Sequence, residues 1–233
     1  MNKNLQIGWL AVLLSAGATT AHAQVSFGPR VGLNLADISQ DYKDLNDEPD
    51  TKLYLGGQVG LSLHMRFGNL ALQPSVLLSQ KGIKRDDSQT AFGITVKTTG
   101  TERLNYLEVP VNLVYTTGGK EGFQVFLGPY AGLGLGGKYD VTRTAVSGAT
   151  GSYTEAGEVK FASKAGTTAK TDYVRSLDFG LNAGVGYKVG PVQMQLGYGL
   201  GLSNLVPNDS NDKAPEDEIN NRVIQLSVAY FFE

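Results

Sequence analysis

The sequence of 233 residues has no cysteine, and charged residues make up only 18% of it. Without cysteine, a disulfide framework, thiol catalysis and a lipidated N-terminal cysteine are excluded. Soluble domains carry about 25% charged residues, so this deficit suggests a surface that does not face water. The formal net charge of −2 offers no basic excess, and we therefore expect no nucleic-acid partner.

Long hydrophobic runs are lacking as well, apart from one at the N-terminus. A lysine precedes an apolar stretch over residues 7–18, and Ala21 and Ala23 form a small-x-small cleavage site. The stretch is too short for a membrane helix and is typical of a secretory signal peptide. We therefore predict a cleaved signal peptide over residues 1–23, followed by one domain over residues 24–233.

What the sequence has in abundance is alternation of apolar and polar residues with a period of two. From Leu53 to Phe67 every odd position except Gly57 is Leu, Val, Met or Phe, and the alternation resumes after a Gly68-Asn69 turn. Strands in globular proteins average about 5–6 residues, whereas about 9–11 tilted residues span a bilayer. This stretch therefore predicts two membrane-crossing strands joined as a hairpin.

Eight alternating segments can be marked along the chain. They are residues 25–36, 52–67, 70–84, 102–116, 123–139, 173–189, 192–203 and 221–232. Three connectors are short turns (68–69, 117–122 and 190–191), and the four between them are long and polar (37–51, 85–101, 140–172 and 204–220). This asymmetry is typical of bacterial outer-membrane barrels, whose short turns lie in the periplasm. We predict an all-β fold: an eight-stranded antiparallel up-and-down transmembrane β-barrel with long extracellular loops.

Two details of this barrel are less regular. Four prolines fall inside predicted strands, where each removes a ladder donor, and we predict β-bulges at them: Pro29, Pro74, Pro110 and Pro129. Residues 140–172 contain alternating Val159 and Phe161, and we expect part of this connector to extend its flanking strands as a hairpin above the membrane.

A secreted barrel of the lipocalin kind shows the same alternation turned inside out. The polar faces of residues 173–189 and 192–203 decide against it, because they are rich in glycine. Glycine weakens a water-facing strand, but small residues suit the narrow lumen of eight strands. We therefore predict that the Leu- and Val-rich faces touch lipid.

Aromatic residues support this orientation. At the short-turn ends, the apolar-face positions predict a periplasmic girdle: Phe27, Phe67, Tyr115, Phe123, Tyr187 and Phe232.

Short sequence motifs within these strands add a family resemblance. They are Gly32-Leu33-Asn34, Gln73-Pro74-Ser75, Ser79-Gln80-Lys81-Gly82, Tyr106-Leu107-Glu108-Val109-Pro110-Val111, Gly128-Pro129-Tyr130 and Gly201-Leu202-Ser203-Asn204-Leu205. In these motifs the chain resembles the PorT-like outer-membrane β-barrel proteins, also called a porin family, over essentially its whole mature length. The resemblance implies an eight-stranded outer-membrane barrel, in a family of which most members lack a defined activity and a few serve in protein secretion.

Polar groups on the inward face are the candidate site residues: Arg30, Gln58, Arg66, Gln73, Glu108, Asp178 and Lys188. A charge in a narrow lumen must pair or stay hydrated, so we expect Arg30 and Glu108 to pair across it, with Asp178 nearer the outside. We expect these side chains to plug the lumen, with an ion pathway as the alternative that single-channel conductance would reveal.

An outer-leaflet lipid-modifying enzyme would need a base and a nucleophile near the long loops. After removal of the signal only His64 remains, beside a short turn, and we expect no enzyme, cofactor or bound metal. Two acidic clusters lack EF-hand spacing and are expected to be solvated loops, with a Ca²⁺ site or a divalent-ion bridge to lipopolysaccharide as the alternative. They are Asp37, Asp41, Asp44, Asp47, Glu48 and Asp50, and Asp209, Asp212, Glu216, Asp217 and Glu218.

The expected function is therefore structural or surface recognition by the extracellular loops of a barrel in the bacterial outer membrane. The alternatives are a narrow pore and an accessory of a protein secretion system. The expected partners are outer-membrane lipid and lipopolysaccharide, the barrel-assembly machinery during biogenesis, and an extracellular or secretion-system protein.

Overall fold

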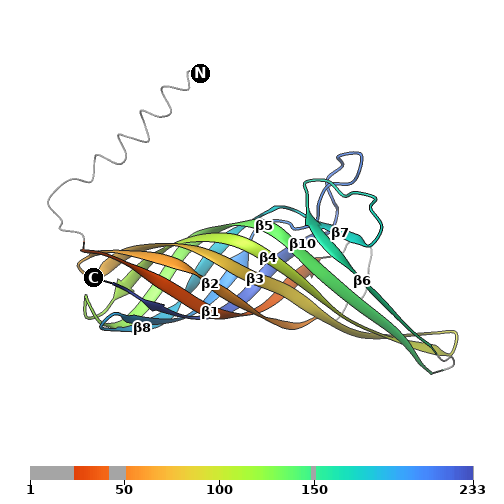
Figure 1. The fold of residues 1–233 in the computed structure, drawn as a ribbon, viewed down its shortest axis with the longest axis horizontal. Helices are drawn as coiled ribbons and strands as arrows, with labels where there is room; N and C mark the ends of the chain where they lie inside the picture. Colours follow the sequence, from red (N-terminus) through yellow and green to blue (C-terminus); the bar gives the residue numbers. More distant parts are fainter. Residues whose placement is uncertain (1–23, 42–50, 148–150, 233) are drawn as a thin grey trace, which may run out of the picture.

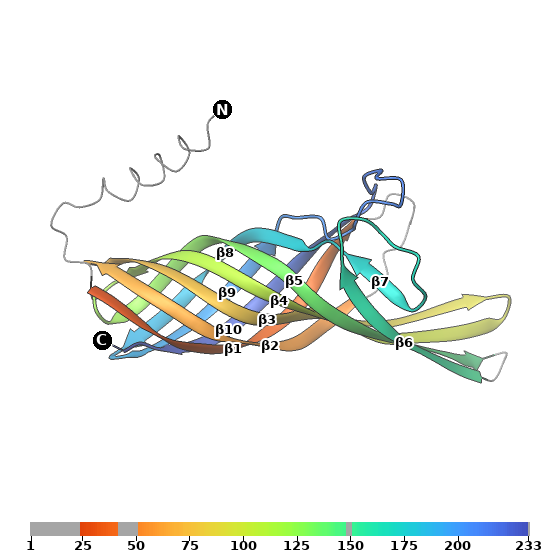
Figure 2. The same ribbon diagram turned by 45° about the horizontal axis from the view of Figure 1, so that its top comes forward.

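The computed structural model of the protein describes residues 24–41, 51–147 and 151–232. The predicted signal peptide, with Ala21 and Ala23, lies outside these residues. The described chain forms strands that lie side by side, tilted around one long axis (Figures 1 and 2). They are β1 (Gln24–Asp41), β2 (Thr51–Phe67), β3 (Leu70–Ala91), β4 (Ile94–Thr116), β5 (Gly122–Ser147), β6 (Gly151–Phe161), β7 (Thr171–Val174), β8 (Leu177–Val189), β9 (Val192–Gly201) and β10 (Glu218–Tyr230). Within these ranges no helix has the length and apolarity needed to cross a membrane.

Eight of these strands close into a barrel. The hydrogen-bonded order is β1–β2–β3–β4–β5–β8–β9–β10, and β10 returns to β1 through antiparallel pairs such as Val31–Val228. β6 pairs with the outer part of β5, and β7 adds to β6 in parallel. β1 begins and β10 ends at the short-turn end of the barrel, on the left in Figure 1. The predicted eight-stranded antiparallel barrel is confirmed.

As predicted, the outer face of the barrel wall is apolar and the inner face is polar. On β2 the outward Leu55, Val59 and Leu61 are each more than half exposed, at 56%, 53% and 63%. On the opposite face of the same strand, the inward Gln58 and Ser62 are buried. A belt of exposed aliphatic side chains around buried amides and hydroxyls is what a bilayer requires, because lipid replaces the apolar core.

Glycine on the inner face makes room for the few large side chains in the lumen. The ring of Phe126 on β5 is buried between β8 and β9 at the level of Gly184 and Gly197. A Cβ at either glycine would lie 2.6 or 2.8 Å from the Phe126 ring, closer than carbon atoms approach. These two positions therefore require glycine.

The wall extends further beyond the membrane than predicted. The connector expected over residues 85–101 is instead the continuation of β3 and β4, paired up to Ala91 and Ile94. Phe92 and Gly93 both have positive φ, at 52° and 78°, as a two-residue type I′ hairpin turn requires. The hairpin expected within residues 140–172 is built from β5 and β6, and the strand expected from residue 173 starts as β8 at Leu177.

The predicted bulges at the prolines are wrong. Pro29, Pro74 and Pro129 sit opposite Leu61, Val111 and Leu181 in ladders whose register does not shift. Pro110 likewise faces Tyr130 within an unshifted stretch of the β4–β5 ladder. A closed barrel holds each strand from both sides, so one missing donor does not displace the register. The shifts occur elsewhere: between Leu53 and Gln58, between Thr95 and Val96, and between Asn105 and Tyr106.

Candidate functional site

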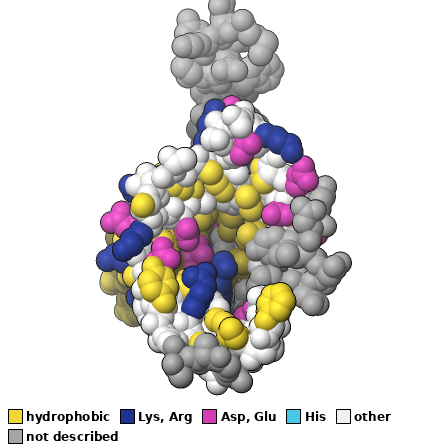
Figure 3. Space-filling model, turned by 90° about the vertical axis from the view of Figure 1, so that its right-hand side faces the viewer, with side chains coloured by type: hydrophobic (Ala, Val, Ile, Leu, Met, Phe, Trp, Pro, Cys, Tyr) yellow, Lys and Arg dark blue, Asp and Glu magenta, His cyan; other side chains and the backbone are white. Residues whose placement is uncertain are grey.

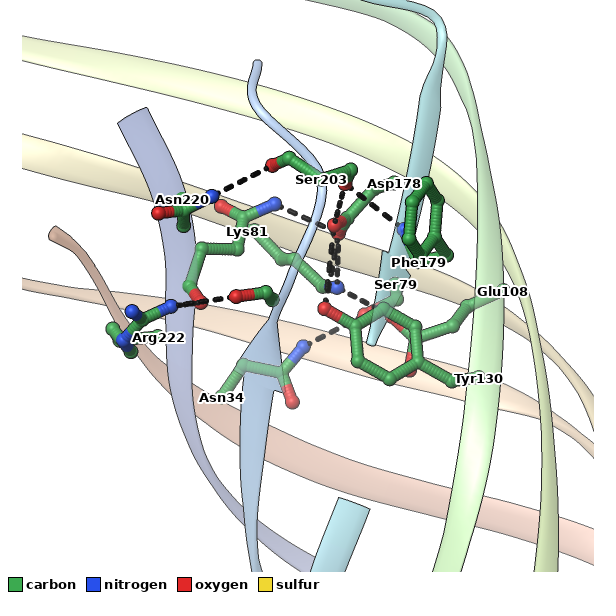
Figure 4. A network of polar contacts seen from close by, with 12 residues as sticks. Asn34, Ser79, Lys81, Glu108, Tyr130, Asp178, Phe179, Ser203, Asn220 and Arg222 are labelled. Atoms are coloured by element: carbon green, nitrogen blue, oxygen red, sulfur yellow. Dashed lines mark hydrogen bonds and ion pairs between the residues drawn. The ribbon is translucent and has the colours of Figure 1, made fainter. Parts of the chain in front are cut away.

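Lys81 lies at the centre of a cluster of buried polar side chains in the lumen (Figure 4). Its Nζ is 2.7 Å from Glu108 Oε2 on β4 and 3.0 Å from Asp178 Oδ2 on β8. The Tyr130 hydroxyl donates to Asp178 Oδ1 at 3.3 Å, and Asn221 Nδ2 donates to Asp178 Oδ2 at 2.8 Å. This lumen cluster, Lys81, Glu108, Asp178, Tyr130 and Asn221, ties β3, β4, β5, β8 and β10 together across the barrel.

Two aromatic rings cover the ammonium group. Lys81 Nζ lies 4.6 Å from the centroid of the Tyr130 ring and 5.3 Å from that of the Tyr106 ring. The faces of aromatic rings attract a cation, and the attraction grows when water is excluded. Lys81 is 1% exposed and Tyr106 is fully buried, so two carboxylates and two rings replace the hydration of the ammonium.

The predicted ion pair between Arg30 and Glu108 is wrong, because Glu108 pairs with Lys81. Arg30 is buried on β1 and donates from Nη2 to the Ser227 hydroxyl at 2.8 Å. Arg30 and Lys81 balance the charges of Glu108 and Asp178. Lys81 was missed as a candidate, although continuing the inward positions from Gln73 through Ser79 would have placed it inside.

The other lumen amides lie nearer the short turns. Gln73 Nε2 donates to Gln193 Oε1 at 2.8 Å, Gln193 Nε2 donates to Gln124 Oε1 at 2.8 Å, and Gln124 Nε2 donates to Thr116 at 3.0 Å. Gln58 is buried on β2. His64 is 3% exposed with its ring 5.2 Å from that of Phe231. These side chains fill the lumen between the Lys81 cluster and the short-turn end of the barrel.

The six residues of the expected girdle are all exposed on the outer face, between 43% and 60%, close to the short turns. They are Phe27, Phe67, Tyr115, Phe123, Tyr187 and Phe232. Phe27 and Phe232 contact each other, with ring centroids 5.8 Å apart.

The barrel mouth holds a cavity of about 260 Å³, directly above Asn221 of the lumen cluster. Its wall is mostly aliphatic, and three charged side chains reach it: Arg85, Glu102 and Asp172. The view into the long-loop end shows a hollow with apolar walls and charged groups of both signs at the opening (Figure 3). We call this space the mouth cavity. It was not predicted, because its walls come from strands and connectors far apart in the sequence.

A lid formed by residues 158–174 covers one side of the mouth. Val159 and Phe161 on β6 and Val174 on β7 pack against Leu104 and Tyr106 of the β4 inner face. The Phe161 ring lies 5.2 Å from that of Tyr106 in an edge-on contact. It also rests on Gly134, where a Cβ would fall 2.2 Å from the Phe161 ring. The lid is therefore attached by a small apolar core.

The outer parts of β3, β4, β5 and β6 form a sheet that protrudes past the mouth (Figures 1 and 2). Thr95 of β4 pairs with Ser147 of β5, so the two hairpins are one sheet. Threonine and serine hydroxyls bridge its strands, as in Thr142–Thr154 at 3.0 Å. At its tip Phe92 is fully exposed. We call residues 86–99, 142–147 and 151–157 the protruding sheet.

The described members of the two acidic clusters do not converge on a common site. Asp44, Asp47, Glu48 and Asp50 lie outside the described residues. Asp209 accepts the backbone N–H of Asn211 and Lys213, which makes it a turn residue. Within the described ranges no group of three or more acidic or histidine side chains could hold a metal ion.

Comparisons with known proteins place this barrel among outer-membrane proteins. Residues 18–206 match the family described as outer membrane protein beta-barrel domain. No curated protein matches the chain in sequence. Among solved structures, the fold is similar to that of Ail, the attachment invasion locus protein of Yersinia pestis, solved with the heparin analogue sucrose octasulfate: identity is 14% and the TM-score 0.39, over 90% of this chain and 99% of that one. It is also similar to Neisserial surface protein A, with 14% identity and a TM-score of 0.42 over the same shares.

Proposed function

Because the chain belongs to the family of outer membrane protein beta-barrel domains, we propose that it is a surface-recognition protein with a plugged lumen. In this proposal the short turns and the aromatic girdle from Phe27 to Phe232 lie at the periplasmic interface, and the protruding sheet stands outside the cell. The closer relation to PorT-like proteins is part of the same proposal.

The observation that carries the recognition role is the protruding sheet. Its edge strand β6 pairs on only one side over residues 151–157, since β7 joins it at Glu158. An open edge of this kind accepts a further strand from a partner through backbone hydrogen bonds. The hydroxyl-rich faces keep such an edge soluble in the absence of a partner.

The lumen cluster supports a plug and disfavours the narrow pore. Lys81 pairs with both Glu108 and Asp178 across the barrel, and a chain of hydrogen-bonded glutamines occupies the lumen nearer the short turns. An ion would have to break a buried ion pair to pass, and interiors of eight-stranded barrels are normally filled by side chains. We also propose no catalytic role, since His64 is buried against Phe231.

Removal of the protruding sheet is the test of the recognition role. We expect a variant in which tight turns replace residues 88–97 and 144–154 to fold and insert, because the barrel below keeps its pairing. Its proximity-labelling map on intact cells should lose the proteins captured by the full chain. A matched variant shortened within residues 208–215 should keep them. Unchanged capture by the first variant would contradict the proposal, and capture of secretion components by the full chain would favour the accessory role.

Lipopolysaccharide is the proposed lipid partner, and a basic patch just beyond the apolar belt supports it. Lys52 sits directly opposite Lys84, and Arg103 directly opposite Lys138. Like charges at such positions destabilise a sheet, so their presence suggests an external anion. The patch has five basic and three acidic side chains, a net charge of +2: Lys52, Lys84, Lys97, Arg103 and Lys138, with Asp86, Asp140 and Glu158.

Reversing two charges of this patch should weaken lipopolysaccharide binding. Lys84→Glu together with Lys138→Glu is expected to cost at least about 1 kcal/mol for each residue at an anionic lipid surface. Lipopolysaccharide retained by the purified barrel would be quantified by phosphate content. Lys120→Glu at the short-turn end is the control and should retain the wild-type amount. Equal retention by all three proteins would count against the patch.

A further inference from the structure

The mouth cavity has the features of a ligand site that recognition by the protruding sheet does not use. We propose that it binds a small organic cation, of the class of a primary amine carried on a single apolar ring. The site lies between the barrel wall and the lid, separate from the edges of the protruding sheet. Its occupant would be a small molecule rather than a protein.

The walls of the cavity supply an apolar surface for the ring of this ligand. Ile83 and Leu205 are buried, at 3% and 5% exposure, yet they belong to neither apolar cluster of the described residues. Both line the mouth cavity, together with Ile38, Val174 and Ile219. Aliphatic side chains from β1, β3, β7, β10 and the connector after β9 therefore converge on one space. Pockets of this kind, with a few polar groups at one side, are where small molecules bind.

The charged groups supply the preference for a cation. Glu102 and Asp172 face the cavity with Arg85, so the charge there is −1, from one base and two acids. The adjoining space beyond them is lined by Tyr139, Asp140, Arg143 and Glu155. Arg143 offsets the charge of Glu155 there, and Asp140 pairs with Arg103 at 3.1 Å. An ammonium group between Glu102 and Asp172 would complete the pairing that Arg85 alone cannot supply.

The titration of the two carboxyl groups agrees with this assignment. Glu102 lies on β4 next to Arg103 of the basic patch, and Asp172 lies on β7 of the lid, so both are beyond the apolar belt. Burial raises the pKa of Glu102, and Asp172 adds to the rise while Arg85 opposes it. Burial also raises the pKa of Asp172, with Glu155 adding to the rise and Arg85 opposing it. A bound cation would lower both pKa values, so amine affinity should fall as the pH drops, beginning above the usual carboxyl range.

The experiment compares three probes that share one ring. Benzylamine, benzyl alcohol and benzoate are titrated into the full barrel in nanodiscs of zwitterionic lipid, and the methyl resonances of Ile83, Leu104 and Val174 are followed by NMR. We expect saturable shifts with benzylamine, at least tenfold weaker binding of benzyl alcohol, and none of benzoate. Benzoate binding as tight as that of benzylamine, or no saturation with benzylamine, would overturn the proposal.

Variants separate the charge from the shape of the cavity. Glu102→Gln and Asp172→Asn keep the side-chain volume, and each should weaken benzylamine at least fivefold without changing benzyl alcohol. Glu216→Gln, on the connector after β9 and paired with Lys213 at 2.9 Å, is the matched control and should leave both affinities unchanged. Amine preference that survives both cavity variants would refute the cation site. None of these results bears on protein capture by the protruding sheet.

Discussion

Lys81→Met is expected to destabilise the barrel by about 3–5 kcal/mol, the cost of removing one partner from a buried ion pair. Methionine fills most of the space of the lysine stem, so the loss is mainly electrostatic. It would leave the carboxylates of Glu108 and Asp178 buried without their shared cation. The measurement is the urea midpoint and slope for unfolding from lipid vesicles free of lipopolysaccharide.

Two comparisons make this result specific to the charge. Lys84→Met is the same substitution further along β3, where the side chain is exposed, and should change stability by no more than about 0.5 kcal/mol. Adding Glu108→Gln and Asp178→Asn to Lys81→Met should recover part of the loss, because neutral amides carry a smaller desolvation cost. Equal effects of the Lys81 and Lys84 substitutions would show that the lumen cluster contributes nothing to stability.

The apolar belt could be predicted because alternation encodes a strand and its two faces together. Leu55, Val59 and Leu61 alternate with Gly56, Gln58 and Gly60, and the small residues on the polar face favour a lipid-facing wall over a secreted barrel. Partners across the lumen could not be predicted in the same way. Strands in a barrel are tilted and staggered, so depth does not follow from distance to a turn. For this reason Glu108 was paired with Arg30 although Lys81 is its partner.

The hairpin within residues 140–172 was expected, whereas the β3–β4 half of the protruding sheet escaped prediction for a different reason. Outside the membrane both faces of a strand meet water, so residues 86–99 carry polar side chains on each face and lose the period-two signal. The turn signal was also weak, because Phe92 occupies a positive-φ position that usually holds asparagine or glycine. The mouth cavity depends on the fold as a whole, since Asp172 of β7 meets Arg85 of β3 and Glu102 of β4 only in the three-dimensional structure.

Phe161→Ala should release the lid while leaving the barrel intact. The half-buried ring contacts Tyr106 and rests on Gly134, so its removal is expected to cost about 2 kcal/mol of local stability. That corresponds to roughly thirtyfold faster hydrogen exchange in residues 158–174. Phe92→Ala removes the same side chain from the exposed hairpin tip and should leave this exchange unchanged.

Gly134→Ala tests the same contact from the barrel wall. Its methyl group would enter the space of the Phe161 ring. It should therefore speed hydrogen exchange in the lid to a similar degree as Phe161→Ala. Once the ring is gone the methyl group has nothing to displace. Gly134→Ala should therefore add little to Phe161→Ala, and the two effects should be strongly non-additive. Additive effects would show that Phe161 does not hold the lid against Gly134, and that another contact attaches the lid.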